Sequence, residues 1–252
     1  DASVADLARG ATPVAVVANA GTTLTGAVDP LDEVAEVCAA RGVWLHVDGA
    51  YGLPAAATRL AGARFRGIER ADSVTLDAHK WLFLPKACGV FLVRDVAALQ
   101  AAFAHRVEYL PREASRLHPL ETTLEYSRPF RALKLWLAFR VHGAEAIRAA
   151  VERNIELGRL LADEIGHHDD LELLGEPELS IVPFRHVPPG VHLDDHNRRL
   201  AEALQADGRV YVASAIIDGE EWLRPCIVNY RTSEDDVRAL VDIAREVGLA
   251  IA

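Results

Sequence analysis

A strand–helix–strand pattern in residues 13–47 limits the fold of this chain more than any other part of the sequence. Residues 13–19 are almost entirely apolar, as expected of a parallel strand covered on both faces. A helical segment begins at Pro30 and ends at Gly42, and residues 43–47 form the next strand. A crossover of this length joins parallel strands in a right-handed sense, so the sequence predicts an α/β sheet.

The predicted strands end in residues that can carry chemistry. Residues 73–76 alternate as a short strand and lead into His79-Lys80-Trp81, while residues 53–70 are an irregular or helical connection. Thr23, Asp48 and Lys80 each follow a predicted parallel strand, so we expect them on one rim of the sheet. Ligands of open α/β sheets bind outside this carboxyl edge.

The residue types on this rim suit one cofactor. Apolar neighbours are expected to desolvate Lys80, which lowers the pKa of an amine and makes it a Schiff-base nucleophile. Pyridoxal phosphate needs such a lysine and an acid against its pyridine nitrogen, a role that Asp48 can fill. Ala50 is predicted to point the same way as Asp48 and to lie flat against the ring. The alternatives are a solvated surface lysine, a turn or capping acid at Asp48, and a turn residue at Thr23.

Downstream of the rim, one further strand is expected at residues 88–94 and a helix at residues 95–103. Residues 105–127 are polar and rich in helix breakers, so they are predicted to form a long loop that serves as a lid or a linker. A helix at residues 130–141 has Leu133, Trp136, Leu137 and Arg140 spaced to bury one face. Gly143 is expected to break or bend the helix before it continues to about residue 165.

The remainder reads as an α+β unit. Strands are predicted at residues 171–174, 179–184, 209–215 and 222–228, and helices at residues 194–206 and 234–248. Asp194 or Asp195 is the expected cap of the first helix, and Thr232 or Ser233 the cap of the second.

The amino-acid composition excludes several classes of binding partner. A net charge of −10 argues against nucleic acid and against anionic membranes. The three scattered cysteines indicate reduced thiols and a cytoplasmic protein, and no apolar run is long enough to span a bilayer. No metal ion is expected. Because the chain has no methionine and starts directly before a strand, we expect it to be part of a longer protein.

Several motifs in order give the sequence a specific resemblance, since their spacing also matches. They are Asn19-Ala-Gly-Thr-Thr23, Gly26-Ala-Val-Asp29-Pro30, Trp44-Leu-His-Val-Asp48-Gly-Ala-Tyr51-Gly52, Asp72-Ser-Val-Thr-Leu-Asp-Ala-His-Lys-Trp81, Ser127-Arg-Pro-Phe-Arg-Ala-Leu-Lys-Leu-Trp136 and Leu223-Arg-Pro-Cys-Ile-Val-Asn229. The chain resembles, almost end to end, the carboxyl-terminal part of the group II pyridoxal-phosphate decarboxylases, which act on aromatic amino acids, glutamate, histidine or cysteine sulfinate.

The resemblance implies roles for individual residues. Lys80 would hold the cofactor, Asp48 would pair with its pyridinium nitrogen, and Ala50 would pack under its ring. His79, helped by Asp77, would lie at the phosphate. In the same way Thr23 would lie near the ring hydroxyl, His46 is a weaker candidate beneath the rim, and Arg224 would meet a substrate carboxylate unless it is structural.

The resemblance is incomplete in two respects. The upstream half of the family, with its phosphate-binding turn and the ring that stacks on the cofactor, has no counterpart in these 252 residues. The loop at residues 105–127 is shorter than the family's lid, which holds the tyrosine that reprotonates the substrate carbon. Tyr109 and Tyr126 are its only candidates here, and neither matches clearly.

The sequence therefore predicts an α/β protein of the fold-type I pyridoxal-phosphate kind. Residues 1–125 would be the rear half of a large domain, residues 126–143 a connecting helix, and residues 144–252 a small α+β domain. The expected activity is decarboxylation of an L-amino acid by a homodimer with its site at the interface. Aldehyde synthesis, transamination and carbon–carbon lysis remain alternatives, as does an inactive half-chain that serves only as a dimer partner.

Overall fold

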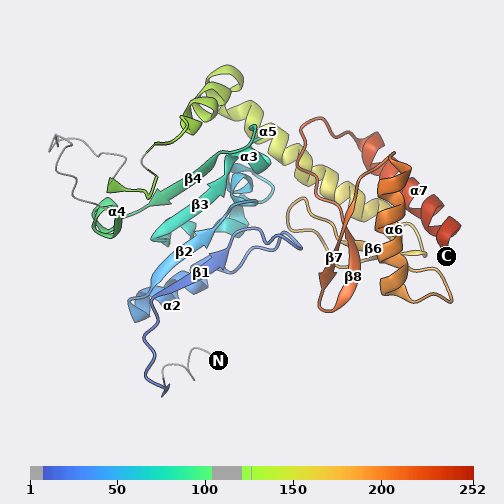
Figure 1. Cartoon of the computed structure of the whole chain (residues 1–252), viewed down its shortest axis with the longest axis horizontal. Helices are drawn as coiled ribbons and strands as arrows, with labels where there is room; N and C mark the ends of the chain where they lie inside the picture. The colour runs from blue at the N-terminus through green and yellow to red at the C-terminus, as the bar shows by residue number, and fades with distance from the viewer. Residues whose placement is uncertain (1–7, 104–120, 126) are drawn as a thin grey trace.

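A mostly parallel sheet forms the first half of the computed structural model, which describes residues 8–103, 121–125 and 127–252 (Figure 1). Its strands lie in the order β1-β2-β3-β4, with β1, β2 and β3 parallel and β4 antiparallel to β3. The strand bounds are β1 Ala15–Asn19, β2 Trp44–Asp48, β3 Ser73–Asp77 and β4 Gly89–Val93. Helix α2 (Leu31–Arg41) joins β1 to β2, so the predicted parallel crossover is confirmed.

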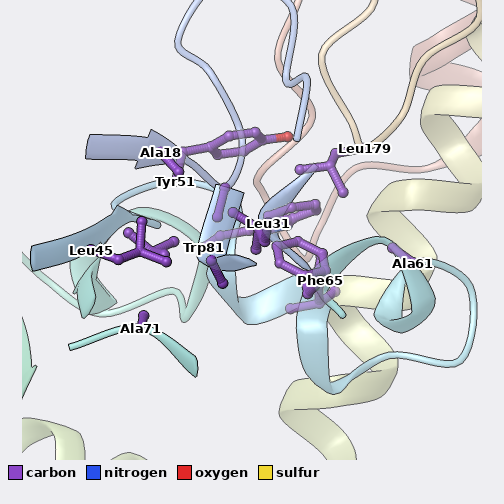
Figure 2. Packing of buried hydrophobic residues seen from close by; sticks show 14 of the residues in the cluster. Ala18, Leu31, Leu45, Tyr51, Ala61, Phe65, Ala71, Trp81 and Leu179 are labelled. Atoms are coloured by element: carbon purple, nitrogen blue, oxygen red, sulfur yellow. The ribbon is translucent and has the colours of Figure 1, made fainter. Parts of the chain in front are cut away.

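One face of this sheet is packed against helices. Leu45 and Val47 of β2 point into a core that also contains Leu31 of α2 and Val151 and Ile155 of the long helix α5 (Arg131–Gly166). The 3₁₀ helices between β2 and β3 close the same core: η1 Leu53–Ala57, η2 Gly62–Phe65 and η3 Ile68–Arg70. Figure 2 shows this packing, with Trp81 and Tyr51 beside Leu31.

The other face and the β1 edge are open, which corrects one expectation. We expected the first strand to be covered on both faces, yet Val14 is 81% exposed and Val17 60% exposed. Among the described residues, β1 is paired with β2 alone and therefore forms a sheet edge. Phe91 and Leu92 of β4 are also exposed. The apolar residues correctly predicted a strand, but they do not show whether another element packs on its faces.

Helix α5 combines the two predicted helices into one bent element. Gly143 has φ 79° and ψ 155°, a conformation that glycine adopts readily, and the helix bends there as predicted. The predicted burial before the bend is wrong, because Leu133, Trp136 and Leu137 are each more than 40% exposed. The apolar stripe exists, but no described element packs on it. Beyond β4, helix α4 (Val96–Phe103) confirms the helix expected at residues 95–103.

A second sheet, antiparallel throughout, follows α5 in the order β5-β6-β8-β7. Helices α5, α6 and α7 pack on it around a second core that contains Leu161, Phe184, Leu200, Leu223 and Val241 (Figure 1). The bounds are β5 Leu171–Leu173, β6 Phe184–His186, α6 Leu193–Asp207, β7 Ala213–Ile217, β8 Glu220–Arg224 and α7 Glu234–Ile251. The predicted strand at residues 171–174 matches β5. The ends of the other three predicted strands differ from those of β6, β7 and β8 by two to five residues, because an apolar run does not mark the residues at which a strand begins and ends.

The N-cap residue was predicted correctly for α7 and wrongly for α6. Ser233 caps α7, its hydroxyl accepting the Asp236 N–H while the Asp236 carboxylate accepts the Ser233 N–H. The predicted cap of α6 is wrong, because the helix starts at Leu193 with His192 before it. The Asp194 carboxylate instead accepts the N–H of Glu221, at 2.9 Å, and so ties α6 to β8.

Two buried histidines lie beneath α7. His186 Nδ1 and His196 Nε2 are 2.8 Å apart, and Asp170 Oδ2 lies 3.7 Å from His186 Nε2. Gly248 of α7 packs directly on His186, where an added Cβ would lie only 2.4 Å from Nδ1. Burial lowers the pKa of both imidazoles, because it disfavours their charged form.

Candidate active site

The three predicted strand ends do meet at one rim. Asn19 at the end of β1 is in register with Asp48, and Asp48 with Thr75 of β3. Backbone hydrogen bonds continue this pairing past the strands, from Ala20 N to Asp48 O at 2.8 Å and from Gly49 N to Thr75 O at 3.0 Å. The segments carrying Thr23, Asp48 and Lys80 therefore leave the sheet side by side at its carboxyl edge.

Lys80 lies in α3 (Ala78–Trp81), a single helical turn that follows β3 directly. Its Nζ is 3.1 Å from the Asp77 Oδ2, and its side chain is 43% exposed. We expected apolar neighbours to desolvate Lys80, and in the part of the chain that the structure describes this expectation is wrong. Successive helix residues point in different directions, so the neighbouring Trp81 enters the core while the amine faces outward.

His79 is held by the start of β4. Its Nδ1 lies 3.2 Å from both the N and the O of Cys88, and its Nε2 lies 3.9 Å from Asp77 Oδ2. The imidazole is thus fixed from one side while its other nitrogen faces the carboxylate that also holds Lys80. Asp77, His79 and Lys80 form one polar cluster at the end of β3.

Asp48 ends β2 on the open face of the sheet. Its Oδ1 accepts the N–H of Ala50 at 3.0 Å, and Ala50 O accepts the N–H of Asp77 at 3.1 Å. Ala50 lies in a turn, so the argument from strand alternation does not apply to it, although the turn keeps it beside both acids. His46 is bonded within the sheet, with its Nδ1 2.8 Å from the Ser73 hydroxyl, which favours a structural role.

Arg224 reaches the rim from the second sheet. Its Nε donates to the Thr23 carbonyl at 2.6 Å, so β8 is tied to the turn after β1. The Thr23 side chain itself is exposed. The contact joins two candidates that are far apart in the sequence. Tyr109 and Tyr126 lie outside the described residues.

Sequence reasoning missed the residues that fasten this rim from behind. Tyr51 stacks on Trp81 with ring centroids 4.9 Å apart and an 8° interplanar angle. Its hydroxyl lies 2.7 Å from that of Ser180, and the indole N–H of Trp81 donates to Asn154 at 3.0 Å. A signal did exist, because Asn154 is the one amide on the buried face of α5, spaced at helical intervals with Ile147, Val151 and Gly158.

The donor set fits pyridoxal phosphate at its ring. A solvent-reachable amine and a carboxylate follow adjacent parallel strands, and the small residue Ala50 is bonded through its backbone to Asp48 and Asp77. Lys80 would hold the aldehyde carbon, Asp48 the ring nitrogen and His79 the phosphate side. Together with the sheet topology, this set defines an α/β protein of the fold-type I pyridoxal-phosphate class.

The comparisons with known proteins agree. Residues 2–187 match the family described as pyridoxal-dependent decarboxylase conserved domain, and the chain belongs to this family. It is 35% identical to an aromatic-L-amino-acid decarboxylase of Bacillus atrophaeus over 97% of this chain and 54% of the relative. It is 36% identical to an L-2,4-diaminobutyrate decarboxylase of Rhizobium meliloti (strain 1021) over 94% of this chain and 49% of the relative.

A solved structure shows the same likeness in three dimensions. The Catharanthus roseus tryptophan decarboxylase in complex with L-tryptophan superposes with a TM-score of 0.90 at 29% identity, covering all of this chain and 54% of the other. The chain thus spans about half the length of the relatives it matches. In the part of the chain that the structure describes, no helix is both long and apolar enough to cross a membrane.

Proposed function

We propose that the protein containing this chain uses pyridoxal 5′-phosphate to decarboxylate an L-amino acid, aromatic or related, to the amine and carbon dioxide. The observation that carries the proposal is the pair of Lys80 and Asp48 at the ends of adjacent parallel strands, in a member of a decarboxylase family. The aromatic-amino-acid and diaminobutyrate decarboxylases among its relatives support this class of substrate.

The bound cofactor would supply an electron sink for the breaking bond between Cα and the carboxylate. The chain's own residues bind and orient it. Lys80 attaches it, and the Asp48 carboxylate, fixed by the Ala50 N–H, keeps the ring nitrogen protonated. Ala50 is small enough to lie under the ring, and His79 with Asp77 is available at the phosphate side. Thr23 would lie near the ring hydroxyl, and the guanidinium of Arg224 beside it would meet the substrate carboxylate.

The remaining organisation follows the same proposal. Residues 1–125 would be the rear half of a cofactor-binding domain, residues 126–143 a connecting helix and residues 144–252 a small domain. A homodimer with the site at its interface is supported by the apolar side chains left exposed on β4 and on α5 before Gly143. A cytoplasmic location is supported by three cysteines that are all free.

The decisive experiment is borohydride reduction of the complete protein as its gene encodes it, followed by peptide mapping. The pyridoxyl group should be found on Lys80, and a label on Lys86 or Lys134 would overturn the assignment. Product analysis with a panel of aromatic and acidic amino acids should then detect amine and carbon dioxide. Aldehyde with ammonia would indicate an aldehyde synthase. Colourless protein without turnover would indicate an inactive dimer partner.

A further inference from the structure

The short helix that carries Lys80 depends on its surroundings for its position. Helix α3 is a single turn, and its N-cap residue Asp77 makes no side-chain capping bond. One isolated turn of helix is not stable by itself, because nucleation costs more than its few hydrogen bonds return. The position of this turn is therefore set by whatever holds Trp81, whose side chain is fully buried, while Asp77 pairs with the Lys80 amine itself.

The Trp81 indole has two anchors. Its face stacks on Tyr51, three residues after Asp48, and its Nε1 donates to Asn154 Oδ1 at 3.0 Å. Figure 2 shows the Tyr51 ring near Trp81 with the hydroxyl end towards the segment of Leu179. The stack therefore fixes the distance of the ring from the acid-bearing strand, while the hydrogen bond fixes its rotation.

Asn154 can serve this ring in one orientation of its amide. An indole N–H only donates and a backbone carbonyl only accepts, so Oδ1 must face Trp81 and Nδ2 must face Asn229 O, which it meets at 3.0 Å. The residue is 1% exposed, and a buried amide is costly unless it is fully bonded. An apolar residue would satisfy the core at this position, but it would leave the indole N–H unpaired.

The loop after β8 supports the other end of the same segment. Tyr230, next to Asn229, meets the ring of Phe83 edge-on at 5.7 Å. Phe83 has φ 59°, a left-handed conformation that is uncommon outside glycine and is retained where surrounding contacts hold it. The Asn229–Tyr230 loop thus touches both the anchor of Trp81 and the residue that follows α3 by two positions.

We propose that Asn154 is a positioning residue for catalysis. Through the Trp81 indole it fixes the position of the Lys80 amine relative to the Asp48 carboxylate. The proposal rests on the assignment of Lys80 as the cofactor lysine. Asn154 touches no reacting atom. Its removal is therefore expected to alter how Lys80 reacts without removing any group from the site.

The test compares Asn154→Leu with a matched variant, Asn197→Leu, in the complete protein. Asn197 is also a fully buried helix amide, bonded to the N and O of His186 and to Leu193 O, but it lies in α6 away from the rim. Both variants should lower Tm. Well below their Tm, only Asn154→Leu should lower kcat, by about tenfold or more, since small misplacement of reacting groups costs rates of this order. KM should change less.

A second readout does not depend on the cofactor. In cofactor-free protein, the rate at which acetic anhydride acetylates Lys80 at one fixed pH should change in Asn154→Leu and in Trp81→Phe, which keeps the stack but loses the donor. Asn197→Leu should keep the wild-type rate. Equal acetylation rates and equal kcat in Asn154→Leu and Asn197→Leu would overturn the proposal. If wild-type protein bears no cofactor on Lys80, the proposed function fails, while the acetylation rates still show whether Asn154 positions the Lys80 amine.

Discussion

Removal of the Tyr51 hydroxyl is predicted to destabilise the protein measurably. Tyr51 is 7% exposed and Ser180 is fully buried. The phenol oxygen lies 2.7 Å from the Ser180 hydroxyl and accepts the Ser180 N–H at 3.1 Å. The bond joins the turn after β2 to the segment before β6, so it links the rim of the first sheet to the second half of the chain.

The expected loss follows from the groups left behind. Tyr51→Phe keeps the ring and its stack on Trp81, so little packing is lost. The Ser180 hydroxyl can rotate to another acceptor, but its backbone N–H has no such freedom. A buried donor without a partner costs about 1–3 kcal/mol. For a chain of this size each kcal/mol lowers Tm by roughly 2–4 °C, so a decrease of about 2–12 °C is expected.

The assay is thermal unfolding of the complete protein, with Tyr211→Phe as the control because Tyr211 is 79% exposed. A second measurement uses pH. Burial raises the pKa of the Tyr51 phenol, so the unfolded chain ionises first and the wild type loses stability as pH rises past about 10. Tyr51→Phe should lose part of that alkaline decline. If Tyr51→Phe and Tyr211→Phe melt alike and share one pH profile, the bond does not stabilise the fold.

Three further predictions concern the site and the second sheet. Asp48→Asn should fold normally, since an amide oxygen can still accept from Ala50, but kcat should fall by on the order of a hundredfold or more; near-normal kcat with cofactor bound would refute the role of Asp48. Burial lowers the pKa of His186 and His196, so the unfolded chain binds more protons and Tm should fall as pH drops below about 6.5. His196→Gln should weaken that decline, and an unchanged slope would exclude the pair as its source. Gly248→Ala should lower stability by about 1–3 kcal/mol despite the helix preference for alanine, because its Cβ would meet His186; a Tm equal to or above wild type would show that the imidazole moves aside.

The sequence by itself determined the parts that depend on neighbours along the chain. The crossover from β1 through α2 to β2, the bend at Gly143 and the cap at Ser233 follow from local apolar periodicity, backbone freedom and side-chain hydrogen bonding. The shared rim followed as well, because parallel strands that end in Asp48 and before Lys80 must present those ends at one edge. The principal candidates of the site could therefore be identified without coordinates.

Only the tertiary structure decided what depends on residues far apart in the chain. The prediction that the first strand and Trp136 are buried is wrong. An apolar stripe shows that burying a face would be favourable, but it does not show that another element packs on that face. Lys80 proved exposed and paired with Asp77, since the helix turn directs it away from Trp81. The bond between Trp81 and Asn154 spans 73 residues of sequence, and no local pattern encodes such a pairing.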